Sequence, residues 1–368
     1  MSSPSEPWRV TQPKDRAALF PQLGRSLALP TLLALPYPHS HFNRRWASVP
    51  FMNGYTQPQF PDEQSEDGSF VRQQDAFRHW VTADGASRFP AAKGRYHLYV
   101  SWACPWAHRT IIVRHLKRLN EVIGMTVVDP IRDERGWAFR DGPDHSRDPI
   151  NSFEFLSEAY LATDPSYLGR VTVPVLWDKE SHSIVNNSDD DLMRIFNSEF
   201  DALTDRQLDL YPQKHRSEID RLNDLIYETV NNGVYRAGFA TSQKAYERAV
   251  YPLFETLDQL DARLADRRYL FGDSPLETDW RLFVTLIRFD AVYHGHFKCN
   301  VRRIVDYPNL YGYLRDLYQI DGIANTVNFD HIKRHYYFTH DDINPTRIVP
   351  VGPAQDLWAP HGRRSPAS

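Results

Sequence analysis

The chain has 368 residues, of which 41% are hydrophobic and 24% charged, with a formal net charge of −4. This composition fits a globular protein of two domains and excludes a disordered chain. The weak acidic balance gives no electrostatic reason to expect nucleic acid or membrane partners, and the apolar run near the start is too short to span a bilayer.

The chain contains only two cysteines, Cys104 and Cys299. Two cysteines cannot form a disulfide framework, so we expect a reducing compartment in which Cys104 is a free thiol. The first 50 residues carry six Lys or Arg against two acidic residues, a bias shared with organelle transit peptides. The low cysteine content favours a cytoplasmic protein, and the basic N-terminal segment makes mitochondrial import the alternative.

The first segment, residues 1–75, is rich in Pro, Ser, Gln and Gly and shows no sustained period. It is predicted to be an arm that is either disordered or wrapped on the fold, and that could serve in targeting. Ordered structure is expected to begin near Arg72, where Phe77, Trp80 and Val81 are spaced for one face of a helix.

A strand, a helix and a second strand are predicted next, over residues 95–100, 105–119 and 125–128. Because a single helix joins the two strands, they are expected to pair in parallel. A long irregular span, 129–170, follows and contains a short predicted helix at about 153–160.

Two further strands are predicted at 173–177 and 183–185, followed by a helix that begins at Ser188 or Asp189. Pro174 conflicts with the first of these strands, because proline has no N–H to donate to a sheet. It therefore requires a sheet edge, a bulge or a cis peptide bond.

The pattern after residue 212 is helical, with apolar residues repeating at helical spacing in several stripes. The stripes comprise Ile219, Leu222, Ile226 and Val230; Val250, Leu253, Leu257, Leu260 and Leu264; and Leu282, Phe283, Leu286 and Phe289. The predicted architecture is a small α/β domain over 76–200, an all-α domain over 201–353, and a tail over 354–368.

Cys104 lies between the first strand and Pro105, a residue suited to the first position of a helix. A cysteine at a helix N-terminus is stabilised as thiolate by unpaired backbone N–H groups and the helix dipole, so a lowered pKa is predicted. His108 and Arg109 follow about one turn later and could add positive charge. The alternative is that Cys104 is a small buried apolar residue.

The sequence has no Cys-x-x-Cys pair, so the chemistry must be that of a single thiol, with an external thiol resolving any mixed disulfide. Cys299 lacks a helix start and is expected to be structural. His331 and His335 have the i, i+4 spacing of zinc ligands, but no third ligand is evident. We expect no metal.

Several long motifs show a resemblance to a known family: "GRYHLYVSWACPWAHRTIIVRHLK", "GRVTVPVLWDK", "NNGVYRAGFA", "VYHGHFKCN" and "NFDHIKRHYYFTHDDINPTRIVPVGP". Together they resemble the glutathionyl-hydroquinone reductases, the Xi class of glutathione transferases. The resemblance implies a thioredoxin-like N-terminal domain, an all-α C-terminal domain and a homodimer. It also implies that Cys104 attacks a glutathionyl-hydroquinone and that glutathione is the co-substrate.

The resemblance also assigns site residues. Trp137, Arg170 and Val173 correspond to the family's glutathione contacts, with the bond from Val173 to Pro174 in cis. The family's phenols near the quinone correspond to Tyr235 and Tyr336, with Tyr293 close to them in the pattern.

The chain departs from the family at the start of the helix after the fourth strand, where Ser188 and Asp189 replace a Glu-Ser pair. The resemblance implies that these two residues bind glutathione, with a different order and reach of the polar groups. A plain helix cap is the alternative.

The leading interpretation is therefore a glutathione-dependent reductase of glutathionyl-hydroquinones. One rival is a conjugating or thiol-transferase type of glutathione transferase, although conjugating enzymes stabilise the glutathione thiolate with a Ser or Tyr hydroxyl. A second rival is a non-catalytic ligand-binding protein on the same fold.

Overall fold

The first domain contains the predicted strand–helix–strand unit. The structure, a computed structural model, describes residues 63–133 and 135–363. β3 (Tyr96–Val100) and β4 (Gly124–Val127) pair in parallel, and α1 (Pro105–Leu116) joins them. The prediction for this unit is confirmed. Residues 1–62, which hold the basic segment of the targeting prediction, lie outside the described residues.

The main sheet has four strands in the order β4-β3-β5-β6. β5 (Val175–Asp178) runs antiparallel to β3, and β6 (Ser183–Asn186) runs antiparallel to β5. The peptide bond from Val173 to Pro174 is cis, and Pro174 lies immediately before β5. This resolves the conflict in the sequence, because the proline precedes the strand that it would interrupt.

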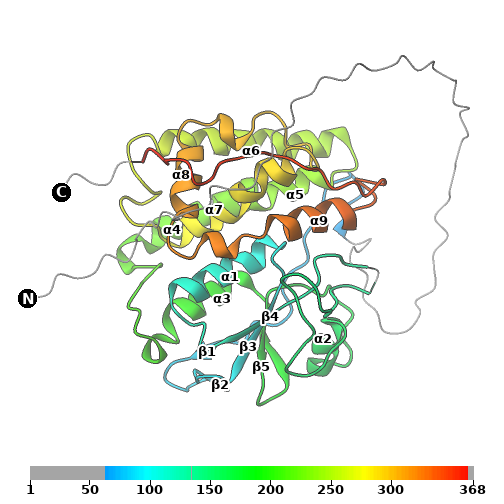
Figure 1. The fold of residues 1–368 in the computed structure, drawn as a ribbon, viewed down its shortest axis with the longest axis vertical. Coiled ribbons are helices and arrows are strands. Elements are labelled where there is room, and N and C mark those ends of the chain that lie inside the picture. The colour runs from blue at the N-terminus through cyan, green and yellow to red at the C-terminus, as the bar shows by residue number, and fades with distance from the viewer. Residues whose placement is uncertain (1–62, 134, 364–368) are drawn as a thin grey trace, which may run out of the picture. The chain divides into compact units, whose positions relative to one another are not determined.

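Two helices separate the sheet from the helical domain. Figure 1 shows α1 and α3 (Asp189–Ser198) side by side above the sheet, with the helices of the second domain beyond them. α1 is buried along most of its length and also packs against α7 (Glu277–Arg288). α2 (Ser157–Thr163) packs against β6 and begins a few residues later than the helix predicted there. This arrangement places the start of α1 at the junction of the two domains.

The helix predicted from Phe77, Trp80 and Val81 does not form. The segment instead runs along β6, where the His79 N–H donates to the Val185 carbonyl at 3.0 Å. It then enters a small parallel pair made of β1 (Val81–Thr82) and β2 (Phe89–Pro90). Three apolar residues fit either structure, and pairing with a strand distant in sequence decided between them.

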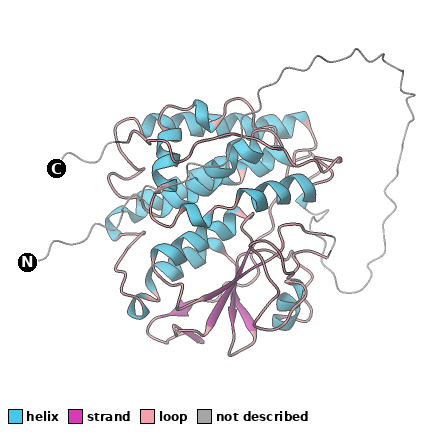
Figure 2. Cartoon of the chain, viewed as in Figure 1, coloured by secondary structure: helices cyan, strands magenta, loops and turns pink. Residues whose placement is uncertain are grey.

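The second domain is helical, as predicted, and Figure 2 shows helices throughout it. Every residue of the predicted apolar stripes is buried. No helix in the described ranges is both long and apolar enough to cross a bilayer. Its α-helices are α4 (Arg216–Ile226), α5 (Gly233–Gly238), α6 (Gln243–Arg263), α7, α8 (Leu310–Tyr318) and α9 (Phe329–Thr339). Its shorter segments are η4 (Tyr227–Asn231), η5 (Phe289–Tyr293), η6 (Ile304–Asp306) and η7 (Ala324–Thr326). η2 (Asp201–Leu203) and η3 (Gln213–His215) precede α4.

Both ends of the described chain pack on this helical domain. Near the start, the Thr241 N–H donates to the Gly68 carbonyl at 3.0 Å. At the other end, the Gln319 side chain donates to the carbonyls of Leu357 and Ala359, both at 2.8 Å. Residues 63–72 are thereby held against the domain that carries Tyr235.

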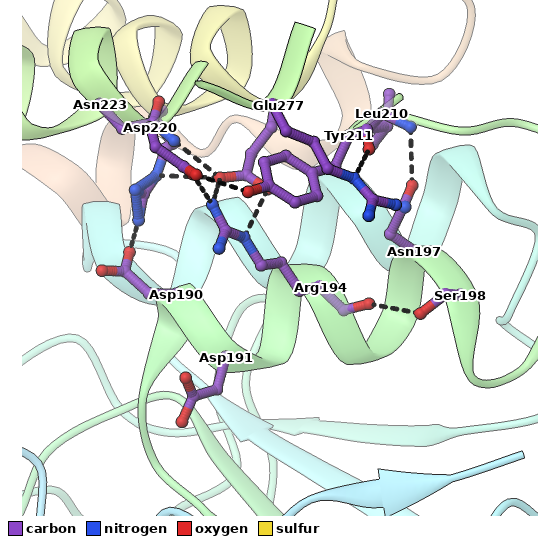
Figure 3. Close-up of polar contacts among 12 residues, drawn as sticks. Asp190, Asp191, Arg194, Asn197, Ser198, Leu210, Tyr211, Asp220, Asn223 and Glu277 are labelled. Atoms are coloured by element: carbon purple, nitrogen blue, oxygen red, sulfur yellow. Dashed lines mark hydrogen bonds and ion pairs between the residues drawn. The ribbon is translucent and has the colours of Figure 1, made fainter. Parts of the chain in front are cut away.

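A polar cluster that is buried at Glu277 and Asn223 joins α3 to the helical domain (Figure 3). Arg194 of α3 donates to Asp220 of α4 at 2.5 Å and to Glu277, the first residue of α7, at 3.2 Å. The Asn223 amide also donates to Glu277 at 2.8 Å. Glu277 is only 3% exposed, so its carboxylate depends on these partners for the hydrogen bonds that it loses from water.

Replacement of Glu277 by alanine is expected to lower the free energy of unfolding by about 3 kcal/mol. The loss follows because the buried Asn223 amide would lose its acceptor and Arg194 would keep only Asp220 of its two carboxylate partners. Urea denaturation measures it. Arg302→Ala is the control, since Arg302 pairs with Asp258 on the surface and its loss should cost less than ~1 kcal/mol. An equal loss of unfolding free energy in the two variants would show that the cluster stabilises the fold no more than a surface ion pair does.

Candidate active site

Cys104 occupies the position that the sequence predicts. β3 ends at Val100, and four residues later Cys104 forms the N-cap of α1, with Pro105 as the first helical residue. The Cys104 sulfur accepts from the Ala107 N–H at 3.5 Å and donates to the Val173 carbonyl at 3.5 Å. The residue is intermediate in exposure and lines a cavity, which favours a working thiol over the alternative of a buried apolar residue.

The thiol opens into a cavity of about 150 Å³ between the two domains. A second cavity of about 310 Å³ adjoins it, and the two share Arg72, Trp106, Arg170, Thr172 and Val173. The first cavity is rich in aromatic residues, and the second is lined by three aspartates and three arginines. Besides the shared residues, the first is lined by Glu63, Phe70, Cys104, Arg132, Trp137, Tyr235, Phe239, His335, Tyr336 and His340, among others.

The structure brings together most of the predicted site residues. Cys104, Trp137, Arg170, Val173, Tyr235 and Tyr336 all line the first cavity, and Asp189 lines the second. Ser188 lines neither cavity and is buried, with its N–H donating to the Asn186 side chain at 2.7 Å. The Ser188 hydroxyl also makes no capping bond to α3.

Asp189 carries a partner that the sequence did not indicate. Its carboxylate accepts from the Arg109 guanidinium at 2.7 Å, and Arg109 is almost fully buried. Arg109 also donates to Asn231 in the helical domain, at 2.7 Å. The charge that Arg109 was predicted to contribute near Cys104 is therefore paired with Asp189.

Three tyrosines of the helical domain form a connected group. The hydroxyls of Tyr235 and Tyr336 lie 2.5 Å apart, and that of Tyr293 lies 3.0 Å from Tyr336. Burial raises the pKa of both Tyr235 and Tyr336. These phenols therefore stay protonated at neutral pH and can act as hydrogen-bond donors toward the cavity.

The predicted lowering of the Cys104 pKa is contradicted. Burial raises the pKa of this thiol, and the N–H groups of Ala107 and Trp106 and the charge of Arg288 oppose that effect without overcoming it. The prediction considered only the helix terminus, whereas desolvation penalises the thiolate wherever the sulfur is enclosed. The S–H group that donates to the Val173 carbonyl fits a protonated thiol.

The sequence analysis missed several charged residues that line the two cavities, among them Arg72 and Glu63. The Arg72 guanidinium lies 4.8 Å from the ring centres of both Trp106 and Tyr235, and Glu63 pairs with Arg170 at 2.5 Å. Both belong to the segment predicted to be an arm, where no hydrophobic period marks them. The only signal was the expectation that ordered structure begins near Arg72.

The histidines set aside as metal ligands have other partners. Rings of His331 and His335 contact the backbone carbonyls of Pro143 and Pro130, each at 2.8 Å. The His335 ring also stacks on Trp137, with centroids 4.9 Å apart. No group of three His, Cys, Asp or Glu side chains suited to a metal occurs among residues 63–133 and 135–363. Cys299 is fully buried, and burial raises its pKa far above the ordinary value.

Sequence comparison matches two domain families to this fold. The glutathione S-transferase N-terminal domain matches residues 103–194, and the C-terminal domain matches residues 243–316. Glutathionyl-hydroquinone reductase YqjG of Escherichia coli is 55% identical over 309 residues, which cover 82% of this chain and 94% of the relative. Glutathionyl-hydroquinone reductase PcpF of Sphingobium chlorophenolicum is 51% identical over 296 residues, covering 80% and 93%.

Solved structures agree with these matches. The glutathione-bound structure of YqjG superposes with a TM-score of 0.77 over 78% of this chain and 96% of that one, at 55% identity. The glutathione transferase Xi of Phanerochaete chrysosporium gives a TM-score of 0.77 over 79% and 94%, at 51% identity. The chain therefore belongs to the glutathione transferase family. Within that family it is a member of the Xi class, the glutathionyl-hydroquinone reductases, and the predicted fold is confirmed.

Proposed function

We propose that this chain, as a cytoplasmic homodimer, uses glutathione to reduce S-glutathionyl-hydroquinones to hydroquinones. The activity is supported by the two reductases that resemble it over nearly their full length. The observation that carries it is a single reachable thiol at a helix N-terminus, facing a cavity that also holds two protonated phenols. The dimer and the compartment rest on the family resemblance and the low cysteine content.

The first half of the reaction forms a mixed disulfide. The Cys104 sulfur attacks the sulfur of the glutathionyl group, and the bond from that sulfur to the ring carbon breaks. The bonding electron pair stays on the ring carbon, which takes a proton, so hydroquinone leaves. The thiol loses one proton and the carbon gains one, so a Cys104 that starts protonated balances the step.

The second half regenerates the thiol. A second glutathione, as thiolate, attacks the glutathione sulfur of the mixed disulfide and leaves as oxidised glutathione. Cys104 recovers its proton. Since Cys299 is fully buried, no protein thiol among the described residues can resolve the disulfide in place of glutathione.

The two cavities suit the two parts of the substrate. Val173 places its carbonyl beside the Cys104 sulfur, where the cysteinyl amide of glutathione would need a backbone partner. Asp189, in the second cavity, is a carboxylate that suits the ammonium group of the γ-glutamyl end. The aromatic first cavity, with Trp137 and Tyr235, would then receive the hydroquinone and the glycyl end.

Replacement of Glu63 by glutamine is expected to lower the KM for glutathione about fivefold, equivalent to ~1 kcal/mol. The planar guanidinium of Arg170 suits a glutathione carboxylate, and in this structure it is paired with the Glu63 carboxylate at 2.5 Å. Steady-state kinetics with varied glutathione measure the change. Arg140→Gln, in an exposed pair with Asp133, is the control. An unchanged or higher KM in Glu63→Gln would show that the two carboxylates do not compete.

Mass spectrometry tests the proposed function directly. Mixing the protein with one equivalent of a glutathionyl-hydroquinone should release hydroquinone and leave one glutathione on Cys104, with none on Cys299. Further glutathione should remove that adduct and yield oxidised glutathione. Release of hydroquinone without an adduct on Cys104 at any time, or an adduct on Cys299, would refute the mechanism.

A further inference from the structure

Arg288, the last residue of α7, is fully buried and contacts the segment that joins β3 to α1. This segment, residues 101–104, is called the Cys104 loop. The Arg288 guanidinium donates to the carbonyls of Trp102 and Ala103, both at 2.9 Å. These are the two residues that precede Cys104 in the chain. A residue of the helical domain therefore fixes the backbone that carries the sulfur in the thioredoxin-like domain.

The remaining bonds of Arg288 also go to neutral partners. It donates to the Val284 carbonyl at 2.8 Å and contacts the His108 Nδ1 atom at 3.0 Å. Burial lowers the pKa of His108 well below its ordinary value, so its ring is neutral. A neutral ring that accepts from Arg288 through Nδ1 carries its proton on Nε2, which lies 2.8 Å from the Thr326 hydroxyl. The tautomer of His108 is thus fixed from both sides.

Arg288 differs in this respect from two other arginines near the site, each of which is paired with a carboxylate. Arg109 is paired with Asp189, and Arg170 is paired with Glu63. Within the described part of the chain, no carboxylate forms an ion pair with Arg288. A buried charge without a counter-ion creates a strong local field, because little solvent screens it.

We propose that Arg288 is the positioning residue of the nucleophile, holding the Cys104 loop through its two carbonyls and stabilising the thiolate with an unpaired positive charge. This proposal deepens the proposed function and rests on Cys104 being the nucleophile. A thiolate that forms during attack gains Arg288 as a counter-ion, and no ion pair with a carboxylate of the described residues competes for that charge. Arg288 would then offset part of the cost that burial imposes on ionisation of the sulfur.

Other charged and titratable groups also face the sulfur. These are the cavity-lining residues Glu63, Arg72, Arg132, Arg170, Tyr235, His335, Tyr336, His340 and Asp342, together with Asp189 at the start of α3. Asp189 disfavours the thiolate, and Tyr235 is a neutral phenol at neutral pH. The contribution of Arg288 to the pKa of Cys104 must therefore be measured by comparing variants that differ only at this residue or at its partner.

The test is the pH dependence of Cys104 alkylation by iodoacetamide, followed by mass spectrometry. This reaction reports the thiolate and needs no glutathionyl substrate, so it is informative even if the proposed reductase activity fails. Arg288→Gln is expected to raise the pKa of Cys104 by about one unit and to slow alkylation at neutral pH about tenfold. Arg288→Lys, which keeps the charge, should shift the pKa by less than half as much.

Arg268→Gln is the matched control for loss of a largely buried arginine. Arg268 makes a two-point pair with Asp316 on α8 and lines neither cavity, so its removal should leave the pKa of Cys104 unchanged. An unchanged Cys104 pKa in Arg288→Gln would overturn the proposal. Equal shifts of the Cys104 pKa in Arg288→Gln and Arg288→Lys would also overturn it.

A second pair of variants applies if Arg288→Gln does not fold. His108→Asp places a carboxylate against Arg288, whereas His108→Asn has the same shape without the charge. The Asp variant should show a Cys104 pKa about one unit higher than the Asn variant, since the guanidinium would be neutralised. Equal pKa values in these two variants would refute the role of the Arg288 charge.

Discussion

Replacement of Cys104 by serine is expected to lower the rate of hydroquinone release from glutathionyl-hydroquinones by ~1,000-fold or more. A serine hydroxyl fits the same N-cap position, where the sulfur accepts from the Ala107 N–H, so the fold should persist. It cannot form a disulfide with glutathione, however, and the covalent route is lost. Chromatography of released hydroquinone measures the rate, and mass spectrometry should find no adduct on the variant.

Cys299→Ser is the matched control, because it changes the only other cysteine, which is buried and lines neither cavity. It should release hydroquinone at close to the wild-type rate. The serine variant at 104 also separates the rival functions. A conjugating transferase would keep or gain activity, because a serine hydroxyl can stabilise a glutathione thiolate. Retained reduction in Cys104→Ser would exclude the mixed-disulfide mechanism.

Local patterns predicted the part of the site that local structure determines. A strand, a cysteine, a proline and an apolar helical stripe follow each other in sequence, and they form β3, the N-cap and α1 in the same order. The conflict posed by Pro174 likewise had a local answer. The phenols of Tyr235 and Tyr336 could not be found this way, because 101 residues separate them, and only the family resemblance selected them.

The remaining features depend on tertiary contacts that no local pattern reports. The pKa of Cys104 is set by enclosure between two domains as well as by its helix terminus. Arg288 reaches the Cys104 loop from 185 residues away, and Glu63 reaches Arg170 from a segment without periodicity. Ser188 is the N-cap residue of α3, at the predicted helix start, but it is buried and lines neither cavity.

The paired phenols bear on a step that distinguishes this reaction from simple disulfide exchange. Breaking a bond between carbon and sulfur leaves an electron pair on the ring carbon, which needs a proton, whereas breaking a disulfide leaves a stable thiolate. Tyr235 and Tyr336 are buried, protonated and hydrogen-bonded to each other at 2.5 Å on the cavity wall. A phenol held by a second phenol can donate a proton while its partner stabilises the resulting charge.

Replacement of Tyr235 or Tyr336 by phenylalanine is therefore expected to lower kcat for reduction of glutathionyl-hydroquinones by about 100-fold. The same variants should reduce a glutathionyl disulfide at close to the wild-type rate, since that reaction needs no proton on carbon. Because the two hydroxyls act as one unit, the double variant should be little slower than either single one. Steady-state kinetics with both substrates measure these effects. Equal losses on the two substrates would assign the tyrosines to binding or packing, and additive losses in the double variant would show that they act independently.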